Sequence, residues 1–345
     1  MKEKSIQWIN YLKAISIIGV YFVHTTQYYG LVPGRLNTLI HPFYVNAFFF
    51  VSGYLFFRKQ LSEMILSQNV KAYVLRGGGQ NLLANIVWRL VIPTLLFSII
   101  EFIPSHMLRG NEFDIGTFLY KTIGGCTYWF TAALVVAEIL LFILLLTRKR
   151  SIWFYLVCSS VIFVLGGYIV SIDFSFFTSY PSLPWQYKHG MYAIIFLALG
   201  GLYWKYETAI RKLINNYILT LLIILYVAAL LLMPDYFRVL VSMLDVNLPG
   251  IVLSLLATII LIEICKLLPP SKWLNYIGMN TIGFYFMSGA LPIVLSMVVH
   301  RIIPFVNYGG LIIVFCCSIG IAFIAVYLMN RFAPWLFDLR LLRKK

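Results

Sequence analysis

Two ionisable side chains, Lys13 and His24, stand within an apolar stretch near the start of the chain. The stretch, residues 7–29, is long enough to cross a bilayer as one helix. At about 100° per residue, the eleven steps between the two residues bring them to one face of that helix, about 16 Å apart along its axis. Such groups are costly inside a membrane and therefore indicate a function. Histidine can accept a proton near neutral pH and an ammonium group can hold an anion, so we predict one pathway with an anionic cofactor at one end and chemistry at the other.

The composition predicts an all-α, polytopic membrane protein. Of the 345 residues, 61% are hydrophobic and 11% are charged, and a soluble domain of this size could not bury so much apolar surface. About ten transmembrane helices are expected, at residues 7–29, 42–57, 82–103, 127–147, 152–171, 190–204, 215–233, 248–268, 275–299 and 308–330. Two of these segments are shorter than the ~20 residues that a span usually needs, so nine or eleven spans are the alternatives.

The basic residues predict the orientation of the chain. With the N-terminus inside, nineteen Lys and Arg residues fall in inner segments and six in outer loops, which favours both termini in the cytoplasm. A single transmembrane domain is then expected at residues 7–330, followed by a short basic cytoplasmic tail at 331–345. The net charge of +15 is spread over short loops, which argues against nucleic-acid binding. The five cysteines show no spacing typical of a metal site, and no metal is expected.

Four further segments combine small, aromatic and basic residues in a fixed order. They are Phe49-Phe50-Val51-Ser52-Gly53-Tyr54, Trp88-Arg89-Leu90-Val91-Ile92-Pro93, Tyr128-Trp129-Phe130 and residues 274–285. With Lys13 and His24, the series resembles the acyltransferase-3 family of integral membrane acyltransferases. The hallmarks of that family include a basic residue and a histidine at this spacing in the first helix. The resemblance extends over most of residues 7–330.

The sequence departs from the family pattern at three positions. The family most often has an arginine at the position of Lys13 and an aspartate at that of Asn10, so an ion pair one turn apart is missing here. Lysine can still bind a phosphate as a point charge, although it lacks the bidentate fork of arginine. Many relatives carry a histidine where this chain has Ser288. Its absence argues against a catalytic base on that late helix.

The resemblance implies transfer of an acyl group, usually acetyl from acetyl-CoA, to a hydroxyl group of a carbohydrate or similar cell-envelope molecule. It implies a multi-pass enzyme of the plasma membrane, in a bacterium. His24 would be the general base that takes the hydroxyl proton, and Lys13 and Arg89 would hold the CoA phosphates near the inner ends of their helices. The expected partners are an acyl-CoA, a hydroxyl-bearing glycan and the bilayer. Lys13 and Arg89 also have a structural interpretation, as cations that reach the inner membrane interface.

Four more residues are candidates for lining the site: Ser52, Tyr128, Trp129 and Glu138. The pair Ser52 and Gly53 is better explained as a packing notch between helices than as a catalytic group. Tyr128 and Trp129 lie where an aromatic belt is expected, with sugar stacking as the alternative. Glu138 falls in the middle of a span, where pairing with a cation or a role toward substrate would compensate its burial.

Two other functions fit the same composition. A transporter or flippase of an envelope precursor would be favoured if Lys13, Glu138 and Glu263 formed a proton relay while His24 were dispensable. A non-catalytic membrane partner of a polysaccharide assembly complex would also tolerate the loss of His24. The identity of the acceptor and of the acyl group, and the oligomeric state, are left open by the sequence.

Overall fold

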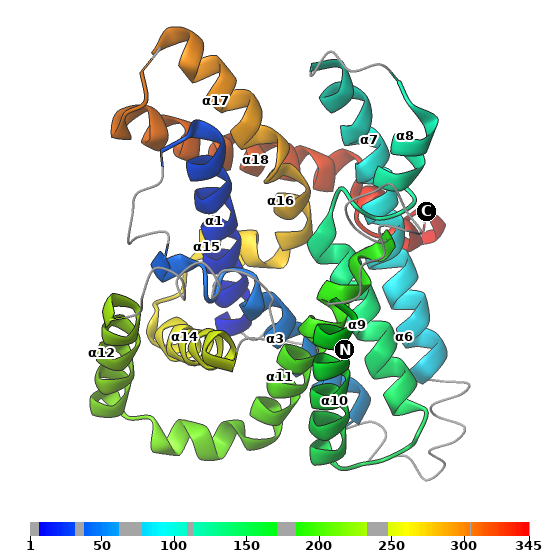
Figure 1. The fold of residues 1–345 in the computed structure, drawn as a ribbon, viewed down its shortest axis with the longest axis vertical. Helices are drawn as coiled ribbons and strands as arrows, with labels where there is room; N and C mark the ends of the chain where they lie inside the picture. Colours follow the sequence, from blue (N-terminus) through cyan, green and yellow to red (C-terminus); the bar gives the residue numbers. More distant parts are fainter. Residues whose placement is uncertain are drawn as a thin grey trace. The chain divides into compact units, whose positions relative to one another are not determined.

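All regular elements in the described part of the chain are helices, as the composition predicts (Figure 1). The computed structural model describes residues 7–31, 38–61, 78–108, 113–170, 184–232, 248–303 and 305–344. The elements are α1 (Gln7–Tyr29), α3 (Asn46–Phe56), η1 (Phe57–Leu61), α6 (Gly78–Ile86), η3 (Val87–Val91), α7 (Ile92–Leu108), α8 (Ile115–Lys121), α9 (Trp129–Leu145), α10 (Ile152–Val170), η4 (Pro184–Gln186), α11 (Tyr187–Leu213), α12 (Asn216–Leu232), α14 (Leu248–Leu267), α15 (Lys272–Met279), α16 (Thr281–Met287), α17 (Ala290–Ile302), α18 (Tyr308–Phe332), η5 (Pro334–Leu336) and η6 (Leu339–Lys344).

Each of the ten predicted apolar segments is helical over most of its length. Residues 7–29 coincide with α1, whereas the short segment 190–204 belongs to the longer helix α11. The segment 275–299 is divided among α15, α16 and α17. Its two breaks fall at Asn280 and around Gly289, both of residue types with low helix propensity. The predicted tail also differs, because it contains the short helices η5 and η6.

Three helical runs in the described ranges are long and apolar enough to cross a membrane: Asn81–Phe102, Leu248–Leu267 and Tyr308–Phe332. The number rises to five if two bent pairs, α11 with α12 and α16 with α17, each count as one span. These helices support the interpretation that the chain is an integral membrane protein. Ten spans and the orientation of the termini stay predictions. α1 has the length of a span but is less apolar than these helices, because it carries polar residues that its neighbours bury.

The surface of α10 illustrates how the helices are suited to lipid. Its exposed large apolar residues include Trp153, Val157, Val161, Val164 and Leu165. Spacings of three and four residues place these side chains on one face of the helix. An apolar face that stays exposed is unfavourable in water and is what a helix presents to acyl chains.

The chain divides into two compact units. The first consists of Met1–Phe48, Lys212–Met243 and Asn247–Pro334, and the second of Phe49–Arg211, Leu244–Val246 and Trp335–Lys345. Each unit therefore combines segments that are far apart in the sequence, and the predicted domain boundary at residue 330 stays a prediction.

In the first unit, α1 is surrounded by the late helices. It contacts α14, α15, α16, α17 and α18 (Figure 1), and fifteen of its 23 residues are buried. The approach of α15 is closest at Gly278, where an added Cβ would overlap with the carbonyl oxygen of Asn10. Glycine is therefore required at Gly278 for the two backbones to come this near to each other.

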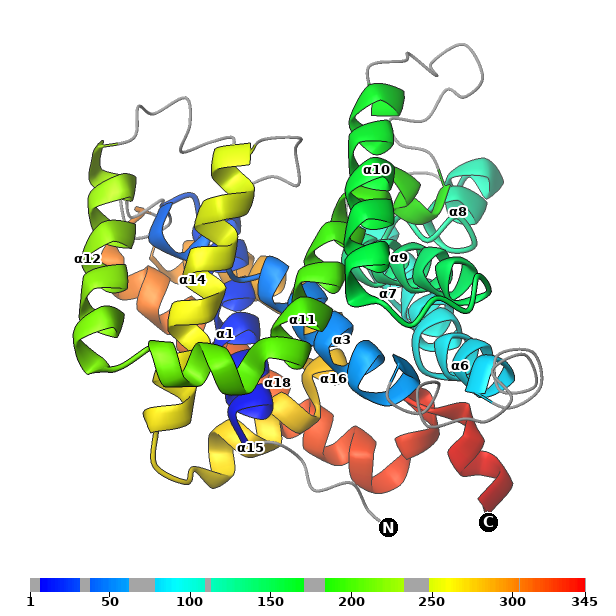
Figure 2. The same ribbon diagram turned by 90° about the horizontal axis from the view of Figure 1, so that it is seen from below.

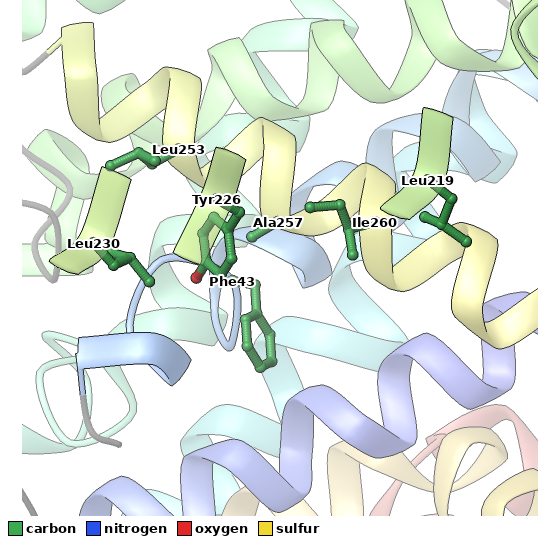
Figure 3. Close-up of a cluster of buried hydrophobic side chains, with 7 residues drawn as sticks. All are labelled: Phe43, Leu219, Tyr226, Leu230, Leu253, Ala257 and Ile260. Carbon is green, nitrogen blue, oxygen red and sulfur yellow. The ribbon is translucent and has the colours of Figure 1, made fainter. Parts of the chain in front are cut away.

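A second set of contacts in the first unit joins α12 to α14, which lie side by side in both views (Figures 1 and 2). Their facing side chains, together with Phe43 from the turn before α3, form the cluster of Figure 3, whose helical members are Leu219, Tyr226, Leu230, Leu253, Ala257 and Ile260. The hydroxyl of Tyr226 donates to the carbonyl of Leu39 at 2.7 Å. This bond satisfies the polar tip of a side chain whose ring is buried.

In the second unit, α3 packs on α11 through glycines of both helices. An added Cβ at Gly53 would overlap with the backbone of Leu197, and one at Gly200 would overlap with the carbonyl oxygen of Phe50. The predicted packing notch at Gly53 is thus what the structure contains, and it is matched by a small residue on the partner helix.

Substitution of Gly278 by alanine should destabilise the first unit, because the methyl group must displace the backbone of α1. Overpacking of this kind costs about 1–3 kcal/mol, so thermal unfolding of the purified protein in detergent should begin at a lower temperature. Gly320 in α18 provides the control, since a Cβ there meets nothing within 4 Å. Gly320→Ala should be neutral or slightly stabilising, and equal melting temperatures for the two variants would contradict the proposed packing.

Candidate active site

The predicted site residues fall into two groups. The first unit carries Lys13 and His24 on α1, and the second unit carries Ser52, Arg89, Tyr128, Trp129 and Glu138. The chemistry that each group can do follows from its contacts within its own unit.

His24, near the end of α1, contacts a backbone carbonyl of the late helices. Its Nδ1 lies 2.8 Å from the carbonyl oxygen of Ser288. A carbonyl oxygen can only accept, so Nδ1 carries the proton in this hydrogen bond. In the neutral ring the other nitrogen, Nε2, then holds a lone pair and can accept a proton from a hydroxyl group. The contact fixes the ring orientation and the tautomer that a general base requires.

The Ser288 carbonyl is available because its own helix offers it no donor. In an unbroken helix this oxygen would accept from the backbone nitrogen of residue 292, but residue 292 is a proline and has no N–H. The break between α16 and α17, bent by 42°, lies at the same place. The Ser288 hydroxyl instead donates to the carbonyl of Tyr285 at 2.7 Å. The late helix therefore contributes a backbone group to His24, although the residue at this position is a serine.

A second carbonyl of α16 is bonded to α1 in the same way. The hydroxyl of Tyr21, one turn before His24, donates to the carbonyl of Phe284 at 2.8 Å. The N–H of Ser288 donates to Tyr285 rather than to Phe284, which leaves the Phe284 carbonyl for Tyr21. Two side chains one turn apart on α1 thus meet two carbonyls one turn apart on α16, and this pair of bonds fixes the rotation of α1.

The opposite end of α1 is bonded to the segment around α15. The amide of Asn10 donates to the side-chain oxygen of Asn275 at 2.6 Å, and the hydroxyl of Tyr11 donates to the carbonyl of Pro269 at 3.1 Å. Asparagine at position 10 thus replaces the ion pair typical of the family with a bond between helices. Lys13 is half-buried one turn further on, and its contact with a phosphate stays a prediction.

In the second unit, Arg89 lies in η3, a single turn of π-helix, with its side chain exposed. Such turns are rare and often occur at functional sites. η3 contacts α9, which carries the half-buried Glu138, and the charges of Arg89 and Glu138 interact. Pairing of Glu138 with Arg89 and a phosphate contact of Arg89 both stay predictions.

Trp129, at the start of α9, lies beside a histidine that the sequence analysis misses. The ring centroids of Trp129 and His189 are 5.4 Å apart. His189 directly precedes the predicted segment 190–204, and only the true start of α11 at Tyr187 brings it into a helix. Tyr128 is buried and Trp129 is half-buried, and for both the aromatic belt and its alternative, sugar stacking, stay predictions.

The motif around Ser52 also makes a polar contact that its sequence does not indicate. The hydroxyl of Tyr54 donates to Oε2 of Glu207 at 2.6 Å, which joins the end of α3 to α11. Ser52 itself is half-buried, and its predicted role in lining the site is not decided by these contacts.

The acidic residues of the rival transporter interpretation have cations nearby in their own units. Glu263 accepts from Lys266, one turn further along α14, at 2.9 Å. Glu138 interacts with Arg89 in the second unit. A proton relay through Glu138 and Glu263 therefore stays a prediction of the rival interpretation.

Of the three comparisons with known proteins, the one with family models gave a match. Residues 6–331 match the family model Acyl_transf_3, which is described as an acyltransferase domain. The match starts just before α1 and runs nearly to the end of α18. Comparisons with curated proteins and with solved structures gave no match.

Replacing Pro292 by alanine tests whether the free carbonyl of Ser288 matters. Alanine restores an N–H that can bond to this carbonyl, so His24 should lose its orientation and acyl transfer should fall by about tenfold. Stability should not fall, because alanine is the better helix former. Acyl transfer and thermal unfolding of the same preparations measure the two effects. Pro249, an exposed residue in the first turn of α14, provides the matched control, and full activity of Pro292→Ala would show that the freed carbonyl is unimportant.

Proposed function

Because the chain belongs to the acyltransferase-3 family of membrane acyltransferases, we propose that it transfers an acetyl group from acetyl-CoA to a hydroxyl group of a cell-envelope carbohydrate. The proposed location is the plasma membrane of a bacterium, where a donor made in the cytoplasm can meet an acceptor on the outer side.

The hydrogen bond from His24 to the Ser288 carbonyl is the observation that carries this proposal. A sugar hydroxyl is a poor nucleophile at neutral pH unless a base removes its proton as it attacks. An imidazole that donates from Nδ1 to a carbonyl presents Nε2 as that base.

The proposed reaction is a direct transfer with His24 moving one proton. The acceptor oxygen attacks the thioester carbon while Nε2 takes the hydroxyl proton. The new C–O bond forms, and the C–S bond of the tetrahedral intermediate then breaks. The proton on Nε2 passes to the leaving sulfur of CoA, so His24 returns to its neutral form and the thiol is released.

Cationic residues are proposed to hold the donor. CoA carries several phosphate charges, which Lys13 can meet with an ammonium group and Arg89 with a planar, bidentate guanidinium. The exposed side chain of Arg89 supports this role, because an anion can reach it. For the acceptor, the half-buried ring of Trp129 supports stacking against a sugar face, with Ser52 as a further proposed lining residue.

Replacing His24 by asparagine distinguishes the functions of its two ring nitrogens, hydrogen-bond donation by Nδ1 and proton acceptance by Nε2. The asparagine amide can still donate toward the Ser288 carbonyl, so α1 should stay in place, but no group remains that can accept a proton. Acyl transfer should fall by at least about a hundredfold. Mass spectrometry of surface glycans from cells with wild type, a deletion or His24→Asn would show this as loss of an acyl mass increment.

The control for this experiment is His300→Gln, at matched membrane levels. His300 is also a half-buried histidine of the first unit, where its ring stacks on Tyr29 with centroids 4.6 Å apart. It should keep the acyl increment. A normal increment in His24→Asn would remove His24 as the base, and a glycan lost without any acyl change would favour transport.

A further inference from the structure

Residues 335–344 are folded and packed on the second unit. Phe337 stacks on Phe97 of α7, with ring centroids 5.7 Å apart and planes 11° from parallel. Phe97 is 2% exposed, so this contact is part of the core of the unit. The segment that was predicted as a short basic tail therefore has a defined position on α7.

Asp338 and Arg340 form a bidentate ion pair in this segment. Nε of Arg340 lies 2.8 Å from Oδ1 of Asp338, and Nη2 lies 2.6 Å from Oδ2. The remaining nitrogen, Nη1, donates to the side-chain oxygen of Asn85 on α6. Arg340 is thus bonded on two sides, which is the geometry in which a guanidinium gives a rigid link.

The same ion pair lies near Arg89. Asn85 precedes Arg89 by one turn, and η6 contacts η3, the π-helical turn that carries Arg89. The pKa of the Asp338 carboxyl is lowered, chiefly by the hydrogen bonds from Arg340, and the charge of Arg89 contributes in the same direction. Arg89 therefore interacts electrostatically with the carboxylate that directly precedes η6 as well as with Glu138 on α9.

We propose that Asp338 and Arg340 are positioning residues for Arg89, which they hold in the orientation that binds the phosphates of the acyl donor. This inference rests on the proposed function, in which Arg89 contacts CoA. Arginine has many rotamers, and fixing it in advance lowers the entropy lost on binding. Arg340 also compensates the charge of Asp338, so the carboxylate can orient Arg89 without repelling an anionic ligand.

Whether Asp338→Asn strengthens or weakens the binding of acetyl-CoA distinguishes a positioning role from a simple effect of charge. Asp338→Asn removes a negative charge, so through charge alone it should strengthen the binding of a polyanion. If Asp338 positions Arg89, the same change should weaken binding of acetyl-CoA to the full-length protein in detergent, by about fivefold. Arg331→Gln, a change at an exposed cation at the end of α18, should leave binding unchanged and serves as the control.

Two further variants identify the residue through which Asp338 acts. Arg89→Gln should weaken binding, and adding Asp338→Asn to it should cause no further loss, because the residue to be positioned is gone. The exchange Asp338→Arg with Arg340→Asp can re-form an ion pair within the segment but places a cation beside Arg89. Binding should stay weak in this double variant.

The opposite results in these binding experiments would overturn the inference. Unchanged or tighter binding by Asp338→Asn, full additivity with Arg89→Gln, or recovery in the exchanged variant would reduce the ion pair to a link between the segment and α6. Failure of the wild type to bind acetyl-CoA would remove the proposed donor itself, and normal binding by Arg89→Gln would remove the role of Arg89. The failure of the proposed function is thus distinguishable from failure of the positioning role alone.

The ion pair should also make the segment sensitive to acid. Because the pKa of Asp338 is lowered in the folded protein, the pair stabilises the fold above the ordinary aspartate pKa of about 3.9 and loses this contribution as pH falls through the folded-state value. Asp338→Asn should melt about 1–2 °C lower than the wild type at pH 7. The difference should shrink as the pH falls below about 3.9 toward the lowered folded-state pKa, and a difference that does not shrink over this range would show that the carboxylate charge is not responsible.

Discussion

A backbone carbonyl within a membrane protein needs a hydrogen-bond donor, and helix irregularities determine which carbonyls must find one outside their own helix. In the first unit, the end of α16 releases two such groups, those of Phe284 and Ser288. Tyr21 and His24 of α1 supply the donors. The position of α1, the tautomer of its histidine and the packing of the surrounding helices all depend on this match between side chains on one helix and free carbonyls on another.

In the second unit, close packing at glycines fixes the positions of the helices. Glycines bring α3 and α11 into backbone contact, and the hydrogen bond from Tyr54 to Glu207 closes the end of that interface. Charged residues are concentrated around η3, where Arg89, Glu138 and Asp338 interact. The first unit thus offers a proton acceptor on a buried helix, and the second offers a cation held among carboxylates. Under the proposed function, the first would take the hydroxyl proton and the second would hold the phosphates of the donor.

The sequence predicts the helices well because hydropathy is a local property. The bounds of α1 agree with the apolar run at 7–29, and the spacing of Lys13 and His24 on one helix follows directly. The division of the segment 275–299 into three helices does not follow from hydropathy. Asn280 and Gly289 interrupt the helix, but whether such residues break a helix, and at what angle, depends on packing. The number of spans is also undecided, since α1 shows that a buried helix need not be strongly apolar.

Partners of the site residues were harder to foresee than the residues themselves. The partner of His24 is a backbone oxygen, which every residue has and which no residue type reveals. Pro292 was the available signal, because it removes the donor that would normally occupy the Ser288 carbonyl. Glu207 and His189 become neighbours of Tyr54 and Trp129 only through the packing of α11, and no spacing in the chain encodes that.

The bond at Nδ1 of His24 has a stereochemical consequence. A lone pair on an imidazole nitrogen points outward in the plane of the ring, so with Nδ1 occupied only one direction of approach allows a proton to be taken. Many carbohydrates carry several hydroxyl groups of nearly equal acidity. If the proposed carbohydrate is the acceptor, the modified position would be decided by which hydroxyl reaches the edge of the ring, and regiochemistry would be a property of the fold rather than of the sugar.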